Sequence, residues 1–166
     1  MPKKKKIVFV CMGNTCRSPM AEKLFDDLLL RRGVTDYEVS SAGLAAMDGD
    51  GAMPCACEVL AEMGLSLTAH RSRKCCVAEL QEAALVVTMT EHQRGVLLPC
   101  LEEDKLVCLG SFGGGDIGDP YGNDIIIYRK CRDQIAAALD KLWDFLQTGS
   151  IGQGQNKRER GLRNDG

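Results

Sequence analysis

The chain has 166 residues, a formal net charge of −2 and 45% hydrophobic residues. This length suits one globular domain with a sizeable core, and the small net charge gives no basic footprint for a nucleic acid partner. No uncharged apolar stretch is long enough to cross a bilayer, and the first apolar run lacks the features of a signal peptide, so we expect a cytoplasmic protein with no membrane partner.

Short apolar runs alternate with amphipathic stretches along the chain, which is typical of strands joined by helical crossovers. In chain order we expect a strand at 7–10, a helix at 20–32, a strand at 37–40, helices at 53–63 and 77–83, a strand at 85–89, a helix at 91–98, a strand at 106–109 and a helix at 125–146. This order predicts an α/β fold that is doubly wound, with three layers and a central four-stranded parallel sheet.

The longest predicted helix carries apolar residues at helical spacing, which indicates a face buried in the core: Ile127, Cys131, Ile135, Leu139, Leu142 and Phe145. Residues 149–166 lose this pattern and are rich in glycine, asparagine, glutamine and basic residues. We therefore expect one domain over 1–148 and a disordered tail over 149–166.

The most informative stretch follows the first strand, where residues 11–19 read Cys-Met-Gly-Asn-Thr-Cys-Arg-Ser-Pro. Ser18 is predicted to cap the next helix and Pro19 to lie in its first turn. The loop is therefore a helix N-terminus, and its backbone amides can converge on one anion, helped by a backbone freedom expected at Gly13.

The cysteine and the arginine of this loop add chemistry to the anion site. The amides and the helix dipole would stabilise the thiolate form of Cys11, which makes its sulfur a nucleophile. The planar fork of Arg17 can hold two phosphoryl oxygens. Taken alone, a cysteine at the end of a strand is more often a small core residue, but strand, loop, arginine and proline occur together here.

The run from Val10 to Glu22 resembles the signature of the low-molecular-weight protein tyrosine phosphatase family, and within it most of all the bacterial protein arginine phosphatase branch. Further similar stretches follow in the same order, so that the resemblance covers about residues 5–148: 39–43, 64–72, 86–89 and 119–121. The resemblance implies a phosphatase-like Rossmannoid fold and a monomer that hydrolyses a phosphorylated side chain of a protein through a cysteinyl-phosphate intermediate.

By this resemblance Cys11 and Arg17 are catalytic, and the rest of the phosphate-binding loop is Met12, Gly13, Asn14, Thr15, Cys16 and Ser18. Asn14, Ser41 and His70 match family positions that form a hydrogen-bonded support for the loop, and an asparagine can take up left-handed backbone conformations. Asp119 matches the general acid, and Pro120 restricts its backbone. An Asp-Pro pair is also a common turn former, and Asp116 and Asp124 are the alternative acids.

Thr15 and Tyr121 bear on the choice of substrate. Tyrosine-specific members usually carry a bulky aliphatic residue at the position of Thr15, whereas this hydroxyl suits a polar phosphoguanidinium. Tyr121 is followed by Gly122 rather than by a second aromatic, and Leu44–Met47 contain none, so a phenyl ring would find few stacking partners. We therefore favour phosphoarginine, with phosphotyrosine as the alternative.

The cysteines allow other interpretations. Nine cysteines at irregular spacing do not indicate disulfides, and Cys55-x-Cys57 and Cys75-Cys76 are too close for ordinary zinc pairs, so we expect no metal and no cofactor. Cys16 could form a reversible disulfide with Cys11. An arsenate reductase would need a thiol relay after the third strand, where residues 89–92 offer none. The remaining alternative is a non-catalytic anion-binding or redox module. Such a module would need neither a nucleophile nor an acid, so the presence of Cys11 and Asp119 together argues against it.

Overall fold

The computed structural model describes residues 3–148. Four strands form one parallel sheet in the order β2-β1-β3-β4: β1 (Lys5–Cys11), β2 (Tyr37–Gly43), β3 (Leu85–Thr88) and β4 (Leu106–Cys108). The predicted four-stranded parallel sheet is confirmed, and β2 runs three residues further than expected. The tail predicted over 149–166 lies outside the described residues.

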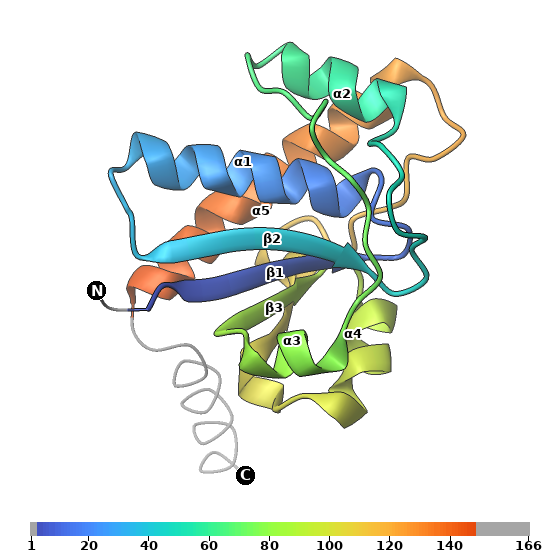
Figure 1. Cartoon of the computed structure of the whole chain (residues 1–166). Coiled ribbons are helices and arrows are strands. Elements are labelled where there is room, and N and C mark those ends of the chain that lie inside the picture. Colours follow the sequence, from blue (N-terminus) through green and yellow to red (C-terminus); the bar gives the residue numbers. More distant parts are fainter. Residues whose placement is uncertain (1–2, 149–166) are drawn as a thin grey trace, which may run out of the picture.

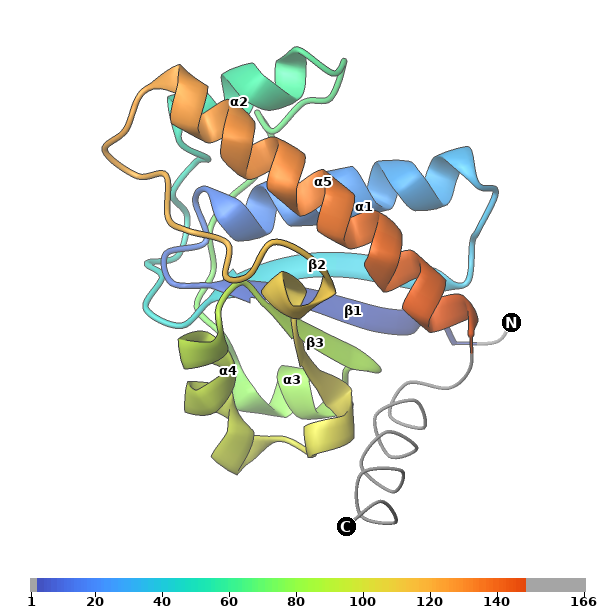
Figure 2. The same ribbon diagram turned by 180° about the vertical axis from the view of Figure 1, so that it is seen from behind.

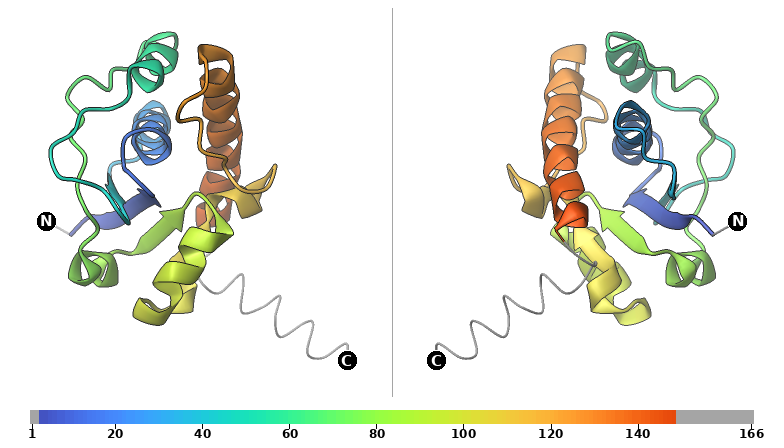
Figure 3. Two further views of the ribbon diagram at one scale, coloured as in Figure 1. Left: turned by 90° about the vertical axis from the view of Figure 1, so that its right-hand side faces the viewer. Right: turned by 90° about the vertical axis from the view of Figure 1, so that its left-hand side faces the viewer.

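Helices cover both faces of the sheet, which gives the predicted three layers (Figures 1 and 3). The helices α1 (Arg17–Arg31) and α5 (Ile125–Gln147) lie on one face, with α2 (Pro54–Ala61) packed against α5. The helices α3 (Val77–Glu82) and α4 (Glu91–Leu97) lie on the other face. Alternate residues of β1 enter the two cores: Ile7 and Phe9 face α1 and α5, whereas Val8 and Val10 face α3 and α4. No helix within residues 3–148 is long and apolar enough to span a membrane.

The long helix α5 crosses α1 on its way across the sheet (Figure 2). Most of its predicted apolar face is buried, but Ile127 is 38% exposed, and the expectation that it belongs to the core is wrong. Tyr128 is buried instead. Tyr128 lies three residues before the buried Cys131, on the same face of the helix. Ile127 is rotated about 100° from Tyr128 around the helix axis and therefore lies off that face.

The start of α1 also differs from the prediction. The helix begins at Arg17, three residues early, and its N-cap is Cys16, without a side-chain cap. Ser18 therefore lies inside the first turn, where its hydroxyl contacts Cys11 and Asn14 rather than a helix amide. Pro19 is tolerated there because the first N–H groups of a helix need no partner within it. The predicted stop at Gly33 is confirmed by its φ of 69°.

The topology leaves a crevice at the carboxyl end of β1. From β1 the chain first crosses to β2 on one side and later reaches β3 on the other, so the crossovers diverge at this point. The end of β2 comes very close to the segment that follows β1: a Cβ built on Gly43 would lie 2.7 Å from the carbonyl oxygen of Met12. Only glycine fits there without moving the backbone.

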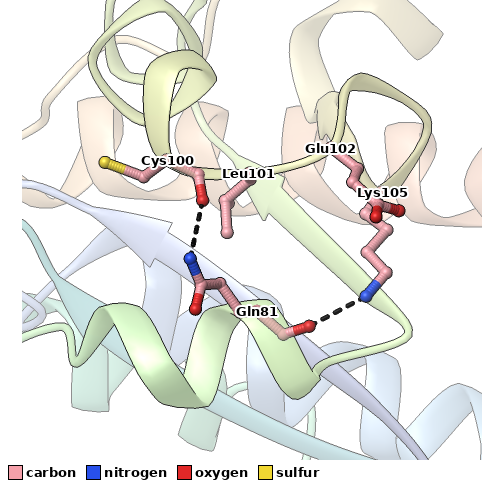
Figure 4. A pocket seen from close by; sticks show the side chains of 5 residues that line it. All are labelled: Gln81, Cys100, Leu101, Glu102 and Lys105. Carbon is pink, nitrogen blue, oxygen red and sulfur yellow. Dashed lines mark hydrogen bonds between the residues drawn. The ribbon is translucent and has the colours of Figure 1, made fainter.

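A hollow of about 190 Å³ lies near the opposite ends of the strands, between α3 and the segment that leads into β4 (Figure 4). The amide of Gln81 donates to the carbonyl of Cys100 at 3.1 Å, and Lys105 Nζ donates to the carbonyl of Gln81 at 2.8 Å. The side chains of Gln81 and Lys105 thus form hydrogen bonds to backbone carbonyls, and these bonds connect α3 to the segment before β4.

Candidate active site

The segment 12–16 curls from the end of β1 to the start of α1 and surrounds a hollow of about 240 Å³. Eight residues line it: Cys11, Met12, Gly13, Thr15, Cys16, Arg17, Asp119 and Tyr121. The hollow therefore brings Asp119 and Tyr121, about a hundred residues away in the sequence, against the loop after β1.

Cys11 lies at the base of this loop and, as a residue, is 3% exposed. The backbone N–H of Asn14 donates to Cys11 Sγ at 3.3 Å, and Ser18 Oγ lies 2.9 Å from the sulfur. Because Ser18 Oγ also accepts a hydrogen bond from the Asn14 side chain, its own proton is free to point at the sulfur. The sulfur of Cys11 is thus surrounded by two hydrogen-bond donors and lies near the N-terminus of α1.

Asn14 holds the loop in its bend. It has a φ of 57°, the only positive φ at a non-glycine residue among residues 3–148, and it is wholly buried. The sequence suggests this backbone freedom at both Gly13 and Asn14, and it is Asn14 that has the positive φ, whereas Gly13 does not. Asparagine is one of the few residue types besides glycine that tolerates this conformation.

The side chain of Asn14 is fully used by its neighbours. Its amide donates to Ser18 Oγ at 2.8 Å and to Ser41 Oγ at 2.9 Å, and its side-chain oxygen accepts from the backbone N–H of Arg73 at 3.0 Å. Its backbone carbonyl lies 2.7 Å from His70 Nε2, so that nitrogen carries the proton of the imidazole. Ser41 and His70 thus lie where the sequence resemblance places loop supports.

Glu22 belongs to this network and was not singled out from the sequence. Ser41 Oγ donates to Glu22 Oε1 at 2.6 Å, which leaves the oxygen of that hydroxyl to accept from Asn14. Glu22 lies on α1, one and a half turns after Arg17, on a part-buried face. In the sequence, Glu22 looks like an ordinary solvent-exposed residue of a helix. Its role becomes visible only in the fold, where β2 packs against α1 and brings Ser41 to Glu22.

The guanidinium of Arg17 joins the loop to the segment that carries Asp119. Arg17 is 6% exposed; its Nη1 donates to the carbonyl of Ile117 at 2.9 Å and its Nη2 lies 3.7 Å from Asp119 Oδ2. Among residues 3–148 the other N–H groups of the fork have no hydrogen-bond partner and can hold an anion in the hollow.

The three candidate acids have different surroundings. The Asp119 side chain is 53% exposed at the rim of the hollow, and its Oδ1 accepts from the N–H of Tyr121 at 3.0 Å. Asp116 accepts from the N–H of Glu91 at the start of α4, and Asp124 caps α5 by accepting from two backbone amides. Asp116 and Asp124 are thus engaged by helix termini, whereas Asp119 faces the hollow.

Thr15 and Tyr121 form part of the wall. Within residues 3–148 the Thr15 hydroxyl has one side-chain contact, a weak one of 4.0 Å to Cys16 Sγ, so it can bond to a bound group. Tyr121 is 65% exposed and is the one aromatic residue that lines the hollow. The wall therefore offers a free hydroxyl and little aromatic surface.

The second thiol of the loop, Cys16, is buried, and its sulfur lies 3.4 Å from the hydroxyl of Tyr128 on α5. Burial raises the pKa of the Cys16 thiol, so it stays protonated near neutral pH. Within residues 3–148 no group of three or more His, Cys, Asp or Glu side chains is arranged to hold a metal ion.

Comparisons with known proteins show which family the chain resembles. The family model for low molecular weight phosphotyrosine protein phosphatase matches residues 6–151. The chain is 38% identical to the protein-arginine-phosphatase of Geobacillus stearothermophilus, over 86% of this chain and 97% of that protein. It is 33% identical to the low molecular weight protein-tyrosine-phosphatase PtpB of Staphylococcus haemolyticus, over 82% of this chain and 96% of that protein.

One similar solved structure carries a phosphoryl group on its own active-site residue. It is a cysteine-to-serine mutant of the YwlE arginine phosphatase with a phosphorylated active-site serine. It superposes with a TM-score of 0.79 and 35% sequence identity, and the match covers 86% of this chain and 95% of that one. In that protein a phosphoryl group is thus attached to the substituted active-site residue.

Proposed function

Since the chain belongs to the low molecular weight phosphotyrosine protein phosphatase family, we propose that it hydrolyses phosphoarginine in protein substrates, with Cys11 as the nucleophile. The chain is a cysteine-dependent protein phosphatase, and a phosphocysteine intermediate fits the family. The preference for arginine and the roles of individual residues are the proposal.

In the first step the Cys11 thiolate attacks phosphorus, the S–P bond forms and the bond from phosphorus to the substrate nitrogen breaks. Arg17 and the loop amides hold the phosphoryl oxygens as charge develops on them. Asp119, at the rim of the same hollow, gives its proton to the leaving nitrogen.

In the second step water attacks the phosphocysteine. Asp119, now a carboxylate, takes a proton from that water, the S–P bond breaks and inorganic phosphate leaves with Cys11 again a thiolate. One carboxyl group therefore serves both half-reactions, and no metal is required by this sequence of steps.

The free hydroxyl of Thr15 carries the proposal for phosphoarginine. It lines the hollow and can accept a hydrogen bond from a guanidinium N–H, which a phenyl ring does not offer. The single exposed aromatic at the rim, Tyr121, gives a phosphotyrosine ring little to stack on. The relative from Geobacillus stearothermophilus, named a protein-arginine-phosphatase, supports the same substrate.

The test compares kcat/KM for phosphoarginine and phosphotyrosine peptides in the wild type, Thr15→Ile and Thr15→Ser. The wild type should prefer phosphoarginine. Thr15→Ile should lower the ratio of the two kcat/KM values about 10- to 100-fold, because a buried polar group left unpaired costs roughly 1–3 kcal/mol. Thr15→Ser keeps the hydroxyl and should keep the ratio.

A Cys11→Ser variant is the control for the chemistry, since it should abolish turnover of both peptides. An unchanged ratio in Thr15→Ile would show that the hydroxyl does not select the substrate. A wild type that prefers phosphotyrosine would favour the alternative activity, which the PtpB relative represents.

A further inference from the structure

Three of the groups that hold Asn14 come from outside the loop, and two of them lie in the segment 70–73. His70 Nε2 binds the Asn14 carbonyl, and the N–H of Arg73 binds the Asn14 side-chain oxygen. This segment belongs to no helix or strand. The bend of the phosphate loop therefore depends on an irregular segment that needs an anchor of its own.

The side chain of Arg73 provides that anchor on β2. Arg73 Nε donates to the carbonyl of Ser41 at 2.9 Å, and Nη2 lies 3.3 Å from Ser40 Oγ. The backbone carbonyl of Arg73 also accepts from the N–H of Gly43 at 2.9 Å. Arg73 thus forms hydrogen bonds to the last residues of β2, among them Ser41, which supports Asn14.

Glu79 on α3 fixes the guanidinium from the other side. It accepts two hydrogen bonds, from Nη1 at 2.5 Å and from Nη2 at 2.7 Å, in the parallel geometry that an arginine fork makes with a carboxylate. Both side chains are only about one-third exposed, at 37% and 30%. Arg73 holds the pKa of Glu79 below its ordinary value, as expected for a carboxylate that is kept charged by this contact.

We propose that Arg73 and Glu79 are positioning residues for catalysis, which hold Asn14, and through it the donors around Cys11, in the geometry that binds the phosphoryl group. The proposal rests on the loop being the catalytic site, but not on which phosphorylated residue the enzyme prefers. An exposed ion pair with no contact to the loop would have no such effect.

The chain offers a matched ion pair for comparison. Glu62, at the end of α2, accepts from Arg129 at 2.8 Å and from Arg132 at 2.7 Å on α5. It is a bidentate carboxylate joining two elements, like Glu79, but in the described part of the chain its polar partners are Arg129 and Arg132 and none lies in the loop. Glu62→Gln therefore removes a comparable ion pair without a path to Asn14.

The experiment measures hydrolysis of an aryl phosphate, para-nitrophenyl phosphate, by the wild type, Glu79→Gln and Glu62→Gln. We expect kcat to fall about tenfold in Glu79→Gln with KM changed less than about threefold, because misaligned donors weaken binding of the transition state more than binding of the substrate. Glu62→Gln should keep kcat within about twofold. Inactivation by iodoacetate, which reports the reactivity of Cys11, should slow in Glu79→Gln alone.

A second comparison tests the route through Asn14. In an Asn14→Ala background the Glu79→Gln substitution should change kcat less than about twofold, since the contact that it acts through is gone. Arg73→Lys keeps the charge but loses the planar guanidinium, so its kcat should fall about as much as that of Glu79→Gln. This variant replaces Glu79→Gln in the experiment if Glu79→Gln does not fold.

The proposal is overturned if Glu79→Gln lowers Tm but leaves kcat and iodoacetate inactivation as they are in Glu62→Gln. The proposal is also overturned if the fold-decrease in kcat of the double variant equals the product of the decreases in Asn14→Ala and Glu79→Gln. A wild type without turnover would instead contradict the proposed function, so the two failures are distinguishable.

Discussion

Asp119 reaches the hollow from a loop, so its contribution should depend on how much the leaving group needs a proton. We expect Asp119→Asn to lower kcat about 10²- to 10⁴-fold for a phosphoarginine peptide, the range for loss of a general acid. A good leaving group such as para-nitrophenolate needs little protonation, so its rate of release should fall far less. Single-turnover rates of phosphorylation of Cys11 measure this step directly.

The matched control for this carboxylate is Asp116→Asn, which lies in the same segment but is bound to the start of α4. Equal losses for both leaving groups in Asp119→Asn, or a larger loss in Asp116→Asn, would assign the proton transfer to another group.

Cys16 should protect Cys11 from irreversible oxidation. Hydrogen peroxide oxidises the Cys11 thiol to a sulfenic acid and is reduced to water; the Cys16 thiol then attacks the Cys11 sulfur, the hydroxyl leaves as water and a disulfide forms. Both residues line the hollow, and the raised pKa of Cys16 keeps its thiol protonated and therefore slow to react with peroxide itself. After peroxide and then dithiothreitol, the wild type should regain activity and Cys16→Ser should regain much less.

Cys131→Ser is the control for that experiment, because Cys131 is another buried thiol, with its pKa raised by burial to about 12. Recovery of Cys16→Ser to the level of Cys131→Ser and the wild type would contradict the protective disulfide.

At single residues, the sequence predicted the site better than it predicted the supports. Cys11, Arg17 and Asp119 are brought to one hollow as their pattern indicated. Glu22 and Arg73 were missed because their partners, Ser41 and Asn14, lie 19 and 59 residues away, and no local spacing marks them. Ser18 was given the role of a helix cap, whereas its hydroxyl is used by Cys11.

Among the elements, α2 is fastened to α5 by charge as well as by packing. Its last turn is followed by Glu62, whose pKa is lowered from 4.5 to about 2, first by hydrogen bonds from Arg129 and then by those from Arg132. Arg132 Nη1 also donates to the carbonyl of Val59 near the end of α2. This arrangement should stabilise the fold only while Glu62 is charged.

We expect Glu62→Gln to lower Tm at pH 7. The pKa of Glu62 is lower in the folded state than in the unfolded one, so its contribution is fully present above about pH 4.5 and is lost as the pH falls towards 2. The difference in Tm between wild type and Glu62→Gln should therefore shrink over this window, and high salt should reduce it at every pH. Thermal unfolding followed by circular dichroism from pH 7 to pH 2 measures it.

Asp27→Asn is the comparison, since Asp27 pairs with Arg31 one turn along α1 and joins no two elements. A Tm difference for Glu62→Gln that stays constant down to pH 2, or that does not exceed that of Asp27→Asn, would show that this contact does not hold α2 in place.

For whole elements, the hydrophobic periodicity of the sequence predicted whether a segment is a helix or a strand. Where each element begins and ends was decided by tertiary packing. The strands and helices occur in the predicted order, because alternating apolar runs and amphipathic stretches fit few arrangements besides a parallel sheet between helices. The helix α1 starts earlier than its capping residues indicate, since the loop before it turns at Asn14 rather than at Gly13. Tertiary contacts of Asn14 stabilise that turn, and no local pattern contains them.

In the whole molecule, the two halves of the site come from segments about a hundred residues apart in the sequence. The end of β1 supplies the thiol, the start of α1 supplies the arginine, and the segment before α5 supplies Asp119. Arg17 connects them through the carbonyl of Ile117 and through Asp119 itself. An anion held by this arginine therefore stabilises the fold across elements that are distant in the sequence.

Binding of inorganic phosphate should consequently raise Tm. A ligand at 100 times its Kd adds about 2.7 kcal/mol to the free energy of unfolding, which is about 5–10 °C for a chain of this size. Arg17→Lys replaces the fork by a point charge and should show less than about half of this shift at the same phosphate concentration. The control Arg129→Lys, on the exposed part of α5, should respond as the wild type does. Differential scanning calorimetry with and without phosphate separates the cases, and equal shifts in the wild type and Arg17→Lys would show that the anion binds elsewhere.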